Sequence, residues 1–400
     1  MSDHPNTGAA AASARSDYPA SRSVVALLVC TALVVLTQLY AAIPLIAPVS
    51  ADLGADVTFA LSAAFSLCYA AGFIVWGPLA DQYGRRRIML IGLVGLTAAT
   101  IGCALAQTVP ALGVLRSLQG FLAASFAPVA LAYLAEAVVP ARRGLAVGAM
   151  STAFLVAGVL GQVVAELVAL RFGWQAVFLG SGALLAVATV GVALRLREPE
   201  RRGDGAGLAR RFARLAQVAS RPTVLLLAFA HVTLLLSLVA MYTALGPHLG
   251  RFGLDPSHIV LLRLVGLPGM FASLLTGRLA KRIGLAGVAR AGFALAAVGL
   301  ALEATLAQSL LGVALASLVF VTGVALAVPA MIGLFGESAA PNRASGMALN
   351  GFVLFVGASV GPIVAQLGWS FQWLLAGLAC VMLISVVWLT VFRRLSARRA

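Results

Sequence analysis

A small number of polar side chains lie inside long apolar runs of this 400-residue sequence. They are Gln38, Tyr40, Arg116, Gln119, His231, Tyr242 and Asn350. Side chains of these types can hydrogen-bond a small organic molecule, and a histidine exposed to water titrates near neutral pH. A charged group in an apolar medium is costly and by default indicates function, which draws attention to Arg116. We therefore take these seven residues as candidate contacts for a small-molecule substrate.

Two of these candidates also have plainer interpretations. Arg116 lies only about five residues from the end of its apolar run, close enough for its long side chain to snorkel to the surface. A single histidine in an apolar helix, such as His231, is commonly a packing residue. Both interpretations stay open at the level of the sequence.

The composition excludes a water-soluble protein. Apolar residues make up 61% of the chain, charged residues only 10%, and the mean hydropathy is +1.01. A soluble domain has about 45–50% apolar and about 25% charged residues, so this chain has more apolar surface than one soluble core can bury. A soluble enzyme, a disordered chain and a disulfide-rich secreted domain are excluded, and an integral membrane protein remains.

The formal net charge of +15 does not indicate nucleic-acid binding. The basic residues lie in short clusters between apolar runs, without the interleaved aromatic residues that single-stranded nucleic acids stack on. The four cysteines all lie inside apolar runs and form no CxxC or Cys/His cluster. We therefore expect no nucleic-acid partner, no metal site and no cofactor.

Twelve apolar runs are long enough to cross a bilayer as helices, since a crossing needs about 20 residues. They fall near 24–46, 58–80, 88–107, 111–135, 144–168, 173–195, 223–247, 257–280, 286–307, 309–335, 344–367 and 371–392. Runs of this length exclude the strands of a membrane barrel, which have about 9–11 residues. The predicted fold is therefore an all-α integral membrane protein with twelve transmembrane helices in two six-helix bundles.

Polar segments divide these runs into domains. We predict a disordered tail over 1–22, a first six-helix bundle over 23–195 and a linker over 196–222. The second bundle then covers 223–392, and a basic tail covers 393–400. The linker is rich in arginine and glycine, which is typical of a solvated connection, with docking on anionic lipid as the alternative role.

The basic residues predict the orientation. Alternate loops carry nearly all of them, in clusters at 85–87, 142–143, 195–221, 278–282 and 393–399. The opposite loops hold only Arg171 and Arg251. Because cytoplasmic loops are enriched in arginine and lysine, both termini and the linker are predicted to be cytoplasmic. Abundant alanine, and arginine in place of lysine almost throughout, suggest a multi-pass protein of a bacterial plasma (inner) membrane.

The two halves of the chain are copies of each other. The segment 77–84 recurs as 277–284 at an offset of 200 residues, and 136–144 recurs as 337–346 in nearly the same register. Six-helix repeats of the same topology are related by an axis along the membrane normal, with the substrate site between them near the midplane. Rocking of the two halves about that site gives alternating access.

The first copy of this loop reads Gly77-x-x-x-Asp81-x-x-Gly84-Arg85-Arg86-Arg87. It resembles the signature loop of the major facilitator superfamily, and the two-times-six repeat fits that family over nearly the whole chain. The resemblance implies that Asp81 and Arg85 belong to a cytoplasmic charge network, which holds the outward-facing state closed on the inside. The second copy has Lys281 in place of the acid.

Other residues at cytoplasmic helix ends are candidates for the same gate. Glu136 and Glu337 each precede a proline and an arginine, and we interpret them as members of gate or topology pairs. The candidate gating residues are Gly77, Asp81, Gly84, Arg85, Arg86, Glu136, Arg142, Glu337 and Arg343.

Two further motifs resemble those of the superfamily. Arg116-Ser-Leu-Gln119-Gly120 resembles its fourth-helix motif, which is linked to proton coupling. The eleventh predicted helix resembles the Gly-Pro motif that antiporters carry on the fifth helix, although the fifth helix here has Gln162 in place of the proline. Small residues at this spacing allow close helix contact. The candidate packing residues are Gly158, Gly161, Gly357, Gly361 and Pro362.

The predicted function is secondary transport of the drug:proton antiporter type. The resemblance implies that the first and seventh helices line the cavity. Their few polar groups suit an apolar or cationic amphiphile that is exported in exchange for protons. An uptake permease for a small anion or sugar, with Arg116 and Arg263 binding the anion, is the alternative with the same fold. A membrane enzyme or sensor is disfavoured because no catalytic cluster is present. We expect a monomer whose partners are the substrate, protons and membrane lipid.

Overall fold

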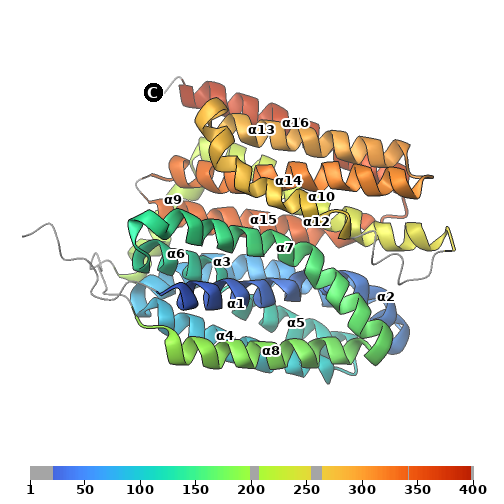
Figure 1. Cartoon of the computed structure of the whole chain (residues 1–400), viewed down its shortest axis with the longest axis horizontal. Coiled ribbons are helices and arrows are strands. Elements are labelled where there is room, and N and C mark those ends of the chain that lie inside the picture. The colour runs from blue at the N-terminus through green and yellow to red at the C-terminus, as the bar shows by residue number, and fades with distance from the viewer. Residues whose placement is uncertain (1–20, 199–206, 254–263, 341, 398–400) are drawn as a thin grey trace, which may run out of the picture.

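The computed structural model describes residues 21–198, 207–253, 264–340 and 342–397. All the regular structure of these residues is helical, and the long helices run roughly parallel to one another (Figure 1). The predicted N-terminal tail lies outside the described residues except at its end, where α1 already begins at Arg22.

The first half of the chain forms eight α-helices and one π-helical turn. They are α1 (Arg22–Tyr40), α2 (Ala42–Leu53), η2 (Phe59–Ala63), α3 (Ala64–Tyr83), α4 (Arg85–Ala104), α5 (Val109–Ala123), α6 (Ala127–Ala137), α7 (Pro140–Phe172) and α8 (Trp174–Arg195). The described helices of the rest of the chain are α9 (Leu208–Ala219), α10 (Pro222–Gly250), α12 (Leu267–Met270), η3 (Phe271–Leu275), α13 (Thr276–Thr305), α14 (Leu310–Ser338), α15 (Arg343–Ala365) and α16 (Phe371–Ala397).

Eleven helical segments of the described residues are long and apolar enough to cross a membrane. One of them, Leu267–Thr305, has 39 residues and contains Gly284 with a φ of 73°, a backbone conformation that favours glycine. The chain reverses within this segment (Figure 1), so the segment makes two crossings. Gly84, 200 residues earlier, has a φ of 106° at the turn between α3 and α4. The predicted twelve crossings and the repeated turn are therefore both present.

Prolines break two of the crossing helices. Pro44 cannot donate to the Tyr40 carbonyl, and α1 gives way to α2 at Ala41. In the same way Pro128 cannot donate to the Ala124 carbonyl, where α5 ends before α6 begins.

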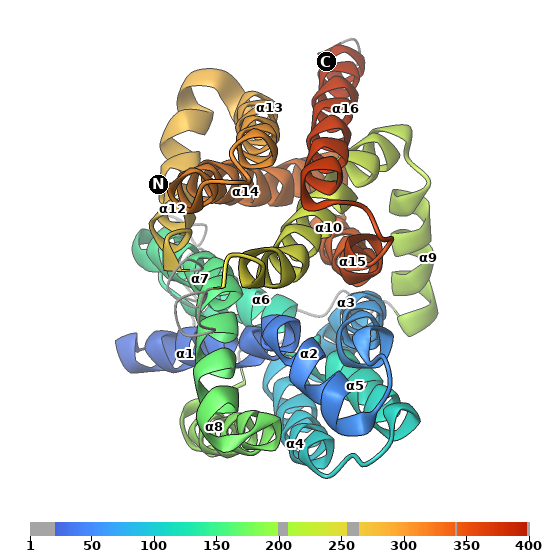
Figure 2. The same cartoon turned by 90° about the vertical axis from the view of Figure 1, so that its right-hand side faces the viewer.

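The helices form two bundles that face each other (Figure 2). One bundle holds α1 to α8 and the other holds α10 to α16, while α9 lies at the side. The start of α1, the end of α16 and α9 lie at the same end of the molecule (Figure 1), as an even number of crossings requires. We refer to this end as the α9 end.

Glycines allow close contact between two pairs of helices. A Cβ at Gly161 of α7 would stand 3.1 Å from the backbone of Thr37 in α1. A Cβ at Gly357 of α15 would overlap the Val232 carbonyl oxygen of α10, and one at Gly361 would approach the Leu236 carbonyl oxygen to 2.9 Å. These glycines lie where helices of one bundle touch, whereas Gly158 faces Tyr40 at ordinary contact distance.

Two segments contain helix that the sequence analysis did not predict. The segment 196–222, expected to be a solvated linker, contains α9. Leu215 and Val218 of α9 lie one turn apart and are buried, so one face of the helix packs on the protein. The expected basic tail over 393–400 begins inside α16, which continues to Ala397.

Candidate functional site

A cavity of about 460 Å³ lies between the two halves. It is lined mainly by α1, α3, α6 and α7 of the first half and by α10, α14 and α15 of the second. The cavity runs from the middle of the molecule to the α9 end, where Asp81, Arg85 and Arg211 line it. Small-molecule sites typically have volumes of about 300–1,000 Å³, so this cavity is the candidate substrate site.

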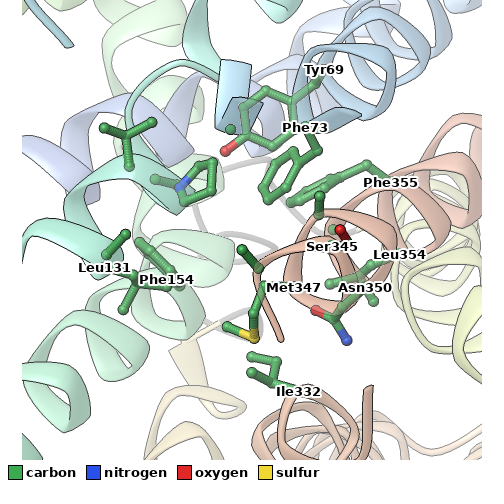
Figure 3. A pocket seen from close by; sticks show the side chains of 18 of the residues that line it. Tyr69, Phe73, Leu131, Phe154, Ile332, Ser345, Met347, Asn350, Leu354 and Phe355 are labelled. Atoms are coloured by element: carbon green, nitrogen blue, oxygen red, sulfur yellow. The ribbon is translucent and has the colours of Figure 1, made fainter. Parts of the chain in front are cut away.

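An aromatic cluster lines the deeper part of the cavity (Figure 3). Tyr69 and Phe73 belong to α3 and Phe355 belongs to α15, so the cluster joins the two halves. The ring of Tyr69 meets that of Phe355 edge to face, with centroids 4.4 Å apart. Gly351 makes room for Phe73, because a Cβ at Gly351 would overlap the phenyl ring. All three rings line the cavity and give this part of it an aromatic wall.

Tyr69 carries a polar group that the sequence analysis did not select. Its side chain is only 1% exposed, and its hydroxyl has no hydrogen-bond partner among the described residues. Figure 3 shows this hydroxyl facing the cavity. A buried hydroxyl without a partner costs free energy, which a solute that hydrogen-bonds it would recover. The signal was available in the sequence, since Tyr69 stands inside an apolar run just as Tyr40 does.

Two of the seven candidate contacts line the cavity, namely Tyr40 and Asn350. The amide nitrogen of Asn350 donates to Nε2 of His231 at 2.8 Å, which leaves the proton of a neutral imidazole on Nδ1. His231 is fully buried, lies behind Asn350 and packs against Phe335, and its Nδ1 has no partner among the described residues. His231 therefore does not line the cavity and is linked to it only by its hydrogen bond with Asn350. Tyr242 is buried but does not line the cavity.

Arg116 is the centre of a buried polar network. Its side chain is fully buried, and Nε donates to the Leu61 carbonyl at 2.7 Å while one Nη donates to the Gln38 carbonyl at 3.1 Å. The other Nη donates to Oε1 of Gln119 at 2.5 Å, and the guanidinium lies 4.3 Å from the ring centre of Phe65. The side chain points into the first bundle, so the snorkelling interpretation is wrong.

The same network fixes Gln119 and Gln38. The amide nitrogen of Gln119 donates to Oε1 of Gln38 at 3.2 Å and to the hydroxyl of Thr100 at 2.8 Å. None of the three predicted residues Gln38, Arg116 and Gln119 lines the cavity. No carboxylate pairs with the guanidinium within the described parts of the chain. The network therefore leaves an uncompensated positive charge inside the first bundle and ties the elements around it together.

Asp81 and Arg85 form a charge cluster at the α9 end. Arg85 lies 3.5 Å from Asp81 and 2.5 Å from Glu136, and Arg211 of α9 lies 3.5 Å from the second oxygen of Asp81. Partial desolvation raises the pKa of Glu136, against the opposing effect of Arg85. Every acid in this cluster belongs to the first half. The cluster is present while the cavity extends to this end, so these pairs alone do not close it.

Glu198 was not selected by sequence reasoning, yet it anchors the start of α4. Its two carboxylate oxygens accept hydrogen bonds from the backbone nitrogens of Arg85 at 2.6 Å and Arg86 at 2.9 Å. An anion at a helix N-terminus satisfies unpaired N–H groups. The Arg86 guanidinium donates to the Ala193 carbonyl at 2.8 Å, so it ties α4 to α8.

The remaining gating candidates occupy simpler positions. Gly77 lines the cavity, and Gly84 makes the turn described above. Arg142, Glu337 and Arg343 are exposed, and no ion pair joins the last two within the part of the chain that the structure describes.

A buried acid stands apart from the cavity. Glu303 of α13 is fully buried and accepts a hydrogen bond from the hydroxyl of Ser317 in α14 at 2.9 Å. Its second oxygen has no partner among the described residues. Glu303 does not line the cavity, and its hydrogen bond links two helices of the second bundle.

The two halves touch at the end opposite α9. The side-chain amide of Gln366, at the end of α15, donates a short hydrogen bond to the hydroxyl of Thr58 in the first half. Asp56 accepts from the backbone nitrogen of Thr58 at 2.9 Å and from its hydroxyl at 2.7 Å. The hydrogen bonds from Thr58 lower the pKa of Asp56. The cavity is therefore bridged at this end and reaches the surface at the other.

Comparison with known proteins agrees with this arrangement. The family model described as the Major Facilitator Superfamily matches residues 28–362. The chain is 27% identical over 356 residues to an uncharacterized MFS-type transporter, YybF, of Bacillus subtilis, covering 86% of this chain and 84% of that protein. It is 36% identical over 140 residues to a multi-drug resistance efflux pump PmrA homolog of Lactococcus lactis, about a third of each chain.

A solved structure has the same fold. The crystal structure of the human organic anion transporter MFSD10 superimposes with a TM-score of 0.72 at 16% identity. The superposition covers 92% of this chain and 99% of that one.

Proposed function

Because the chain belongs to the major facilitator superfamily, we propose that this transporter exports a small organic solute in exchange for protons by alternating access. The observation that carries the proposal is the cavity between the two halves. It reaches the surface at the α9 end and is bridged by Thr58 and Gln366 at the other. A site that is open on one side only is what alternating access requires of each end state.

The lining of the cavity supports an amphiphilic solute. Apolar side chains from both halves surround it, and the aromatic cluster of Tyr69, Phe73 and Phe355 lies across the junction of the halves. A relative that matches a third of the chain is named as an efflux pump, which supports export. The resemblance of the Arg116 and Gln119 motif to one linked with proton coupling supports protons as the coupling ion.

We place the α9 end in the cytoplasm of a bacterial cell and the protein in its inner membrane. The clusters of arginine at this end support that orientation. Large exposed apolar side chains such as Leu194, Val187 and Trp373 suit contact with lipid, and we propose that the monomer is functional. Cysteines introduced at Gln107 and Ala216 should react with impermeant reagents from opposite sides of the membrane, and labelling from one side would contradict the orientation.

The structure does not favour the uptake of an anion through Arg116. The three nitrogens of its guanidinium already donate to Leu61, Gln38 and Gln119, and the side chain does not line the cavity. Arg263, the other residue of that alternative, lies outside the described residues.

The proposal is tested in inside-out membrane vesicles that carry a pH gradient, acid inside. A transported compound should discharge the gradient, which a pH-sensitive dye reports as recovery of fluorescence. Vesicles from the same cells without the protein are the control. If a compound enters the vesicles without needing the gradient and without dissipating it, the protein works by facilitated diffusion and not by antiport.

A further inference from the structure

We propose that the deep part of the cavity binds an uncharged aromatic carbonyl compound. Its oxygen accepts a hydrogen bond from the hydroxyl of Tyr69, and its ring lies against Phe73 and Phe355. This inference rests on the proposed transport function and names the substrate class. It narrows the apolar or cationic solute that the sequence suggested to an uncharged one. Three observations carry it: the unpaired hydroxyl of Tyr69, the rings around it and its distance from the charged side chains of the cavity.

The hydroxyl of Tyr69 is a buried donor that faces the cavity. Tyr69 is 1% exposed, its hydroxyl has no hydrogen-bond partner among the described residues, and Figure 3 shows the oxygen directed into the cavity. A phenol hydroxyl has one proton to donate, and it accepts weakly because its lone pair is delocalised into the ring. A buried donor without a partner costs free energy, which a bound carbonyl oxygen recovers. The unpaired hydroxyl therefore favours a solute that carries an acceptor.

Three rings hold the Tyr69 ring in place. Phe65 stacks on it with ring centroids 5.7 Å apart, and Phe73 meets it edge to face at 5.2 Å. Phe355 of the second half meets it edge to face at 4.4 Å. The position of the hydroxyl is therefore set before a solute binds, which reduces the entropy that is lost on binding.

The wall beside this hydroxyl suits an aromatic solute. Phe73 and Phe355 both line the cavity, and their ring centroids are 5.4 Å apart. Aromatic rings attract a further ring in offset or edge-to-face geometry. A carbonyl group on the rim of an aromatic ring keeps its oxygen close to that ring, so one small molecule can contact both the donor and the wall. The cavity, at about 460 Å³, has room for a molecule of two fused rings.

The charged side chains of the cavity lie far from this hydroxyl. Among the described residues that line the cavity, the charged ones all stand at the α9 end: Asp81, Arg85, Arg211 and Arg214. Tyr69 precedes Asp81 by twelve residues of α3, which is roughly 18 Å along a helix axis. A charged group bound beside Tyr69 would lack a counter-ion at membrane depth, which is costly. The site therefore favours an uncharged group, whatever the balance of charge at the mouth.

The buried guanidinium of Arg116 does not change this conclusion. Arg116 does not line the cavity, and its three nitrogens already donate within the first bundle. It offers no free donor to an anion, and its charge opposes a cation nearby. A carbonyl oxygen carries only a partial negative charge, which is compatible with both constraints.

The test uses two probes that differ in one group. They are 2-acetylnaphthalene and 2-isopropenylnaphthalene, in which a methylene group replaces the carbonyl oxygen. Dissociation constants are measured by equilibrium dialysis for the wild type and for Tyr69→Phe, in one detergent on both sides of the dialysis membrane. Comparing the two proteins cancels the partition of each probe into micelles.

The preference for the ketone should depend on Tyr69. We expect Tyr69→Phe to weaken binding of the ketone relative to the alkene by at least about fivefold, the size of effect expected for one buried hydrogen bond. The same ratio of dissociation constants in both proteins would overturn the proposal, and so would the absence of saturable ketone binding to the wild type.

Three further variants control this result. Tyr83→Phe makes the same change on the same helix at an exposed position outside the cavity lining, and it should keep the wild-type ratio. Loss of the ratio in Tyr40→Phe but not in Tyr69→Phe would assign the donor to the wrong phenol here. Phe355→Leu should weaken both probes by at least about twofold, because it removes a ring of the wall and leaves the donor. Unchanged binding of both probes would overturn the position of the ring. Matched melting temperatures exclude misfolding of the variants.

Transport assays separate this inference from the proposed function. Both probes are added to the inside-out vesicles with a pH gradient. If the ketone binds in a manner that depends on Tyr69 but discharges no gradient, the assignment of the site stands and its proton-coupled export fails. If other compounds discharge the gradient while the ketone shows no binding that depends on Tyr69, export stands and the carbonyl assignment fails.

Discussion

Arg116 shows how the cost of a buried charge is offset without a counter-ion. Three acceptors from three places in the chain, Leu61, Gln38 and Gln119, receive its donors in a fixed planar fork. Arg116→Lys keeps the charge but cannot reach all three acceptors. Each buried acceptor left without a partner costs about 1–3 kcal/mol, so we expect a clearly lower melting temperature in detergent.

The control for Arg116→Lys is Arg171→Lys. Arg171 is exposed in the last turn of α7, where a change of cation leaves no buried group without a partner. An unchanged melting temperature in Arg116→Lys would mean that the charge alone, and not the fork, is what the network needs.

Asp56 gives stability a dependence on pH. Hydrogen bonds from Thr58 lower its pKa, so the charged form stabilises this conformation, and that contribution is lost as the pH falls through the lowered value. The wild type should melt at a higher temperature than Asp56→Asn at pH 7, and the difference should shrink as the pH falls below 4, near the ordinary carboxyl value. Glu337→Gln, at an exposed position, is the control. A difference that stays constant with pH would contradict the role of the charge.

At the scale of helices, glycine spacing predicts which helices are in close contact. It does not predict whether a larger side chain would fit at each glycine. Gly357→Ala places a methyl group on the Val232 carbonyl oxygen, and overpacking of this kind typically costs about 1–3 kcal/mol. Gly336→Ala in α14 has open space around the new Cβ and should stabilise by roughly 0.5–1 kcal/mol. Melting temperatures should therefore move in opposite directions. A parallel rise in both variants would mean that helix propensity, and not packing, governs them.

The sequence predicts elements better than it predicts the site. Long apolar runs and the offset of 200 residues are enough for the helices and the repeat, because lipid requires the backbone to be hydrogen-bonded within helices. The aromatic cluster escaped prediction, since Phe73 and Phe355 look like any apolar residue in a helix that is apolar all round. The helix α9 was also not predicted, because its two buried residues, Leu215 and Val218, are surrounded in the sequence by arginines.

At the scale of the whole molecule, the repeat predicts two bundles and a site between them. It does not predict which end is open, because the same sequence must form both end states of the transport cycle. In this conformation the halves meet through Thr58 and Gln366, and the cavity extends to the α9 end. Alternating access requires that the contact between Thr58 and Gln366 breaks in every cycle.

Cross-linking tests this requirement. Replacing Thr58 and Gln366 with cysteine, after removal of the four native cysteines, allows a short reversible bis-thiosulfonate reagent to join the halves at the end opposite α9. Transport should stop on cross-linking and return on reduction. Cysteines at Asp52 and Gln175, which hydrogen-bond at 3.4 Å within the first half, are the matched pair that should leave transport intact. Full activity of the cross-linked Thr58 and Gln366 variant would exclude opening at this end, and with it the rocking of two rigid halves.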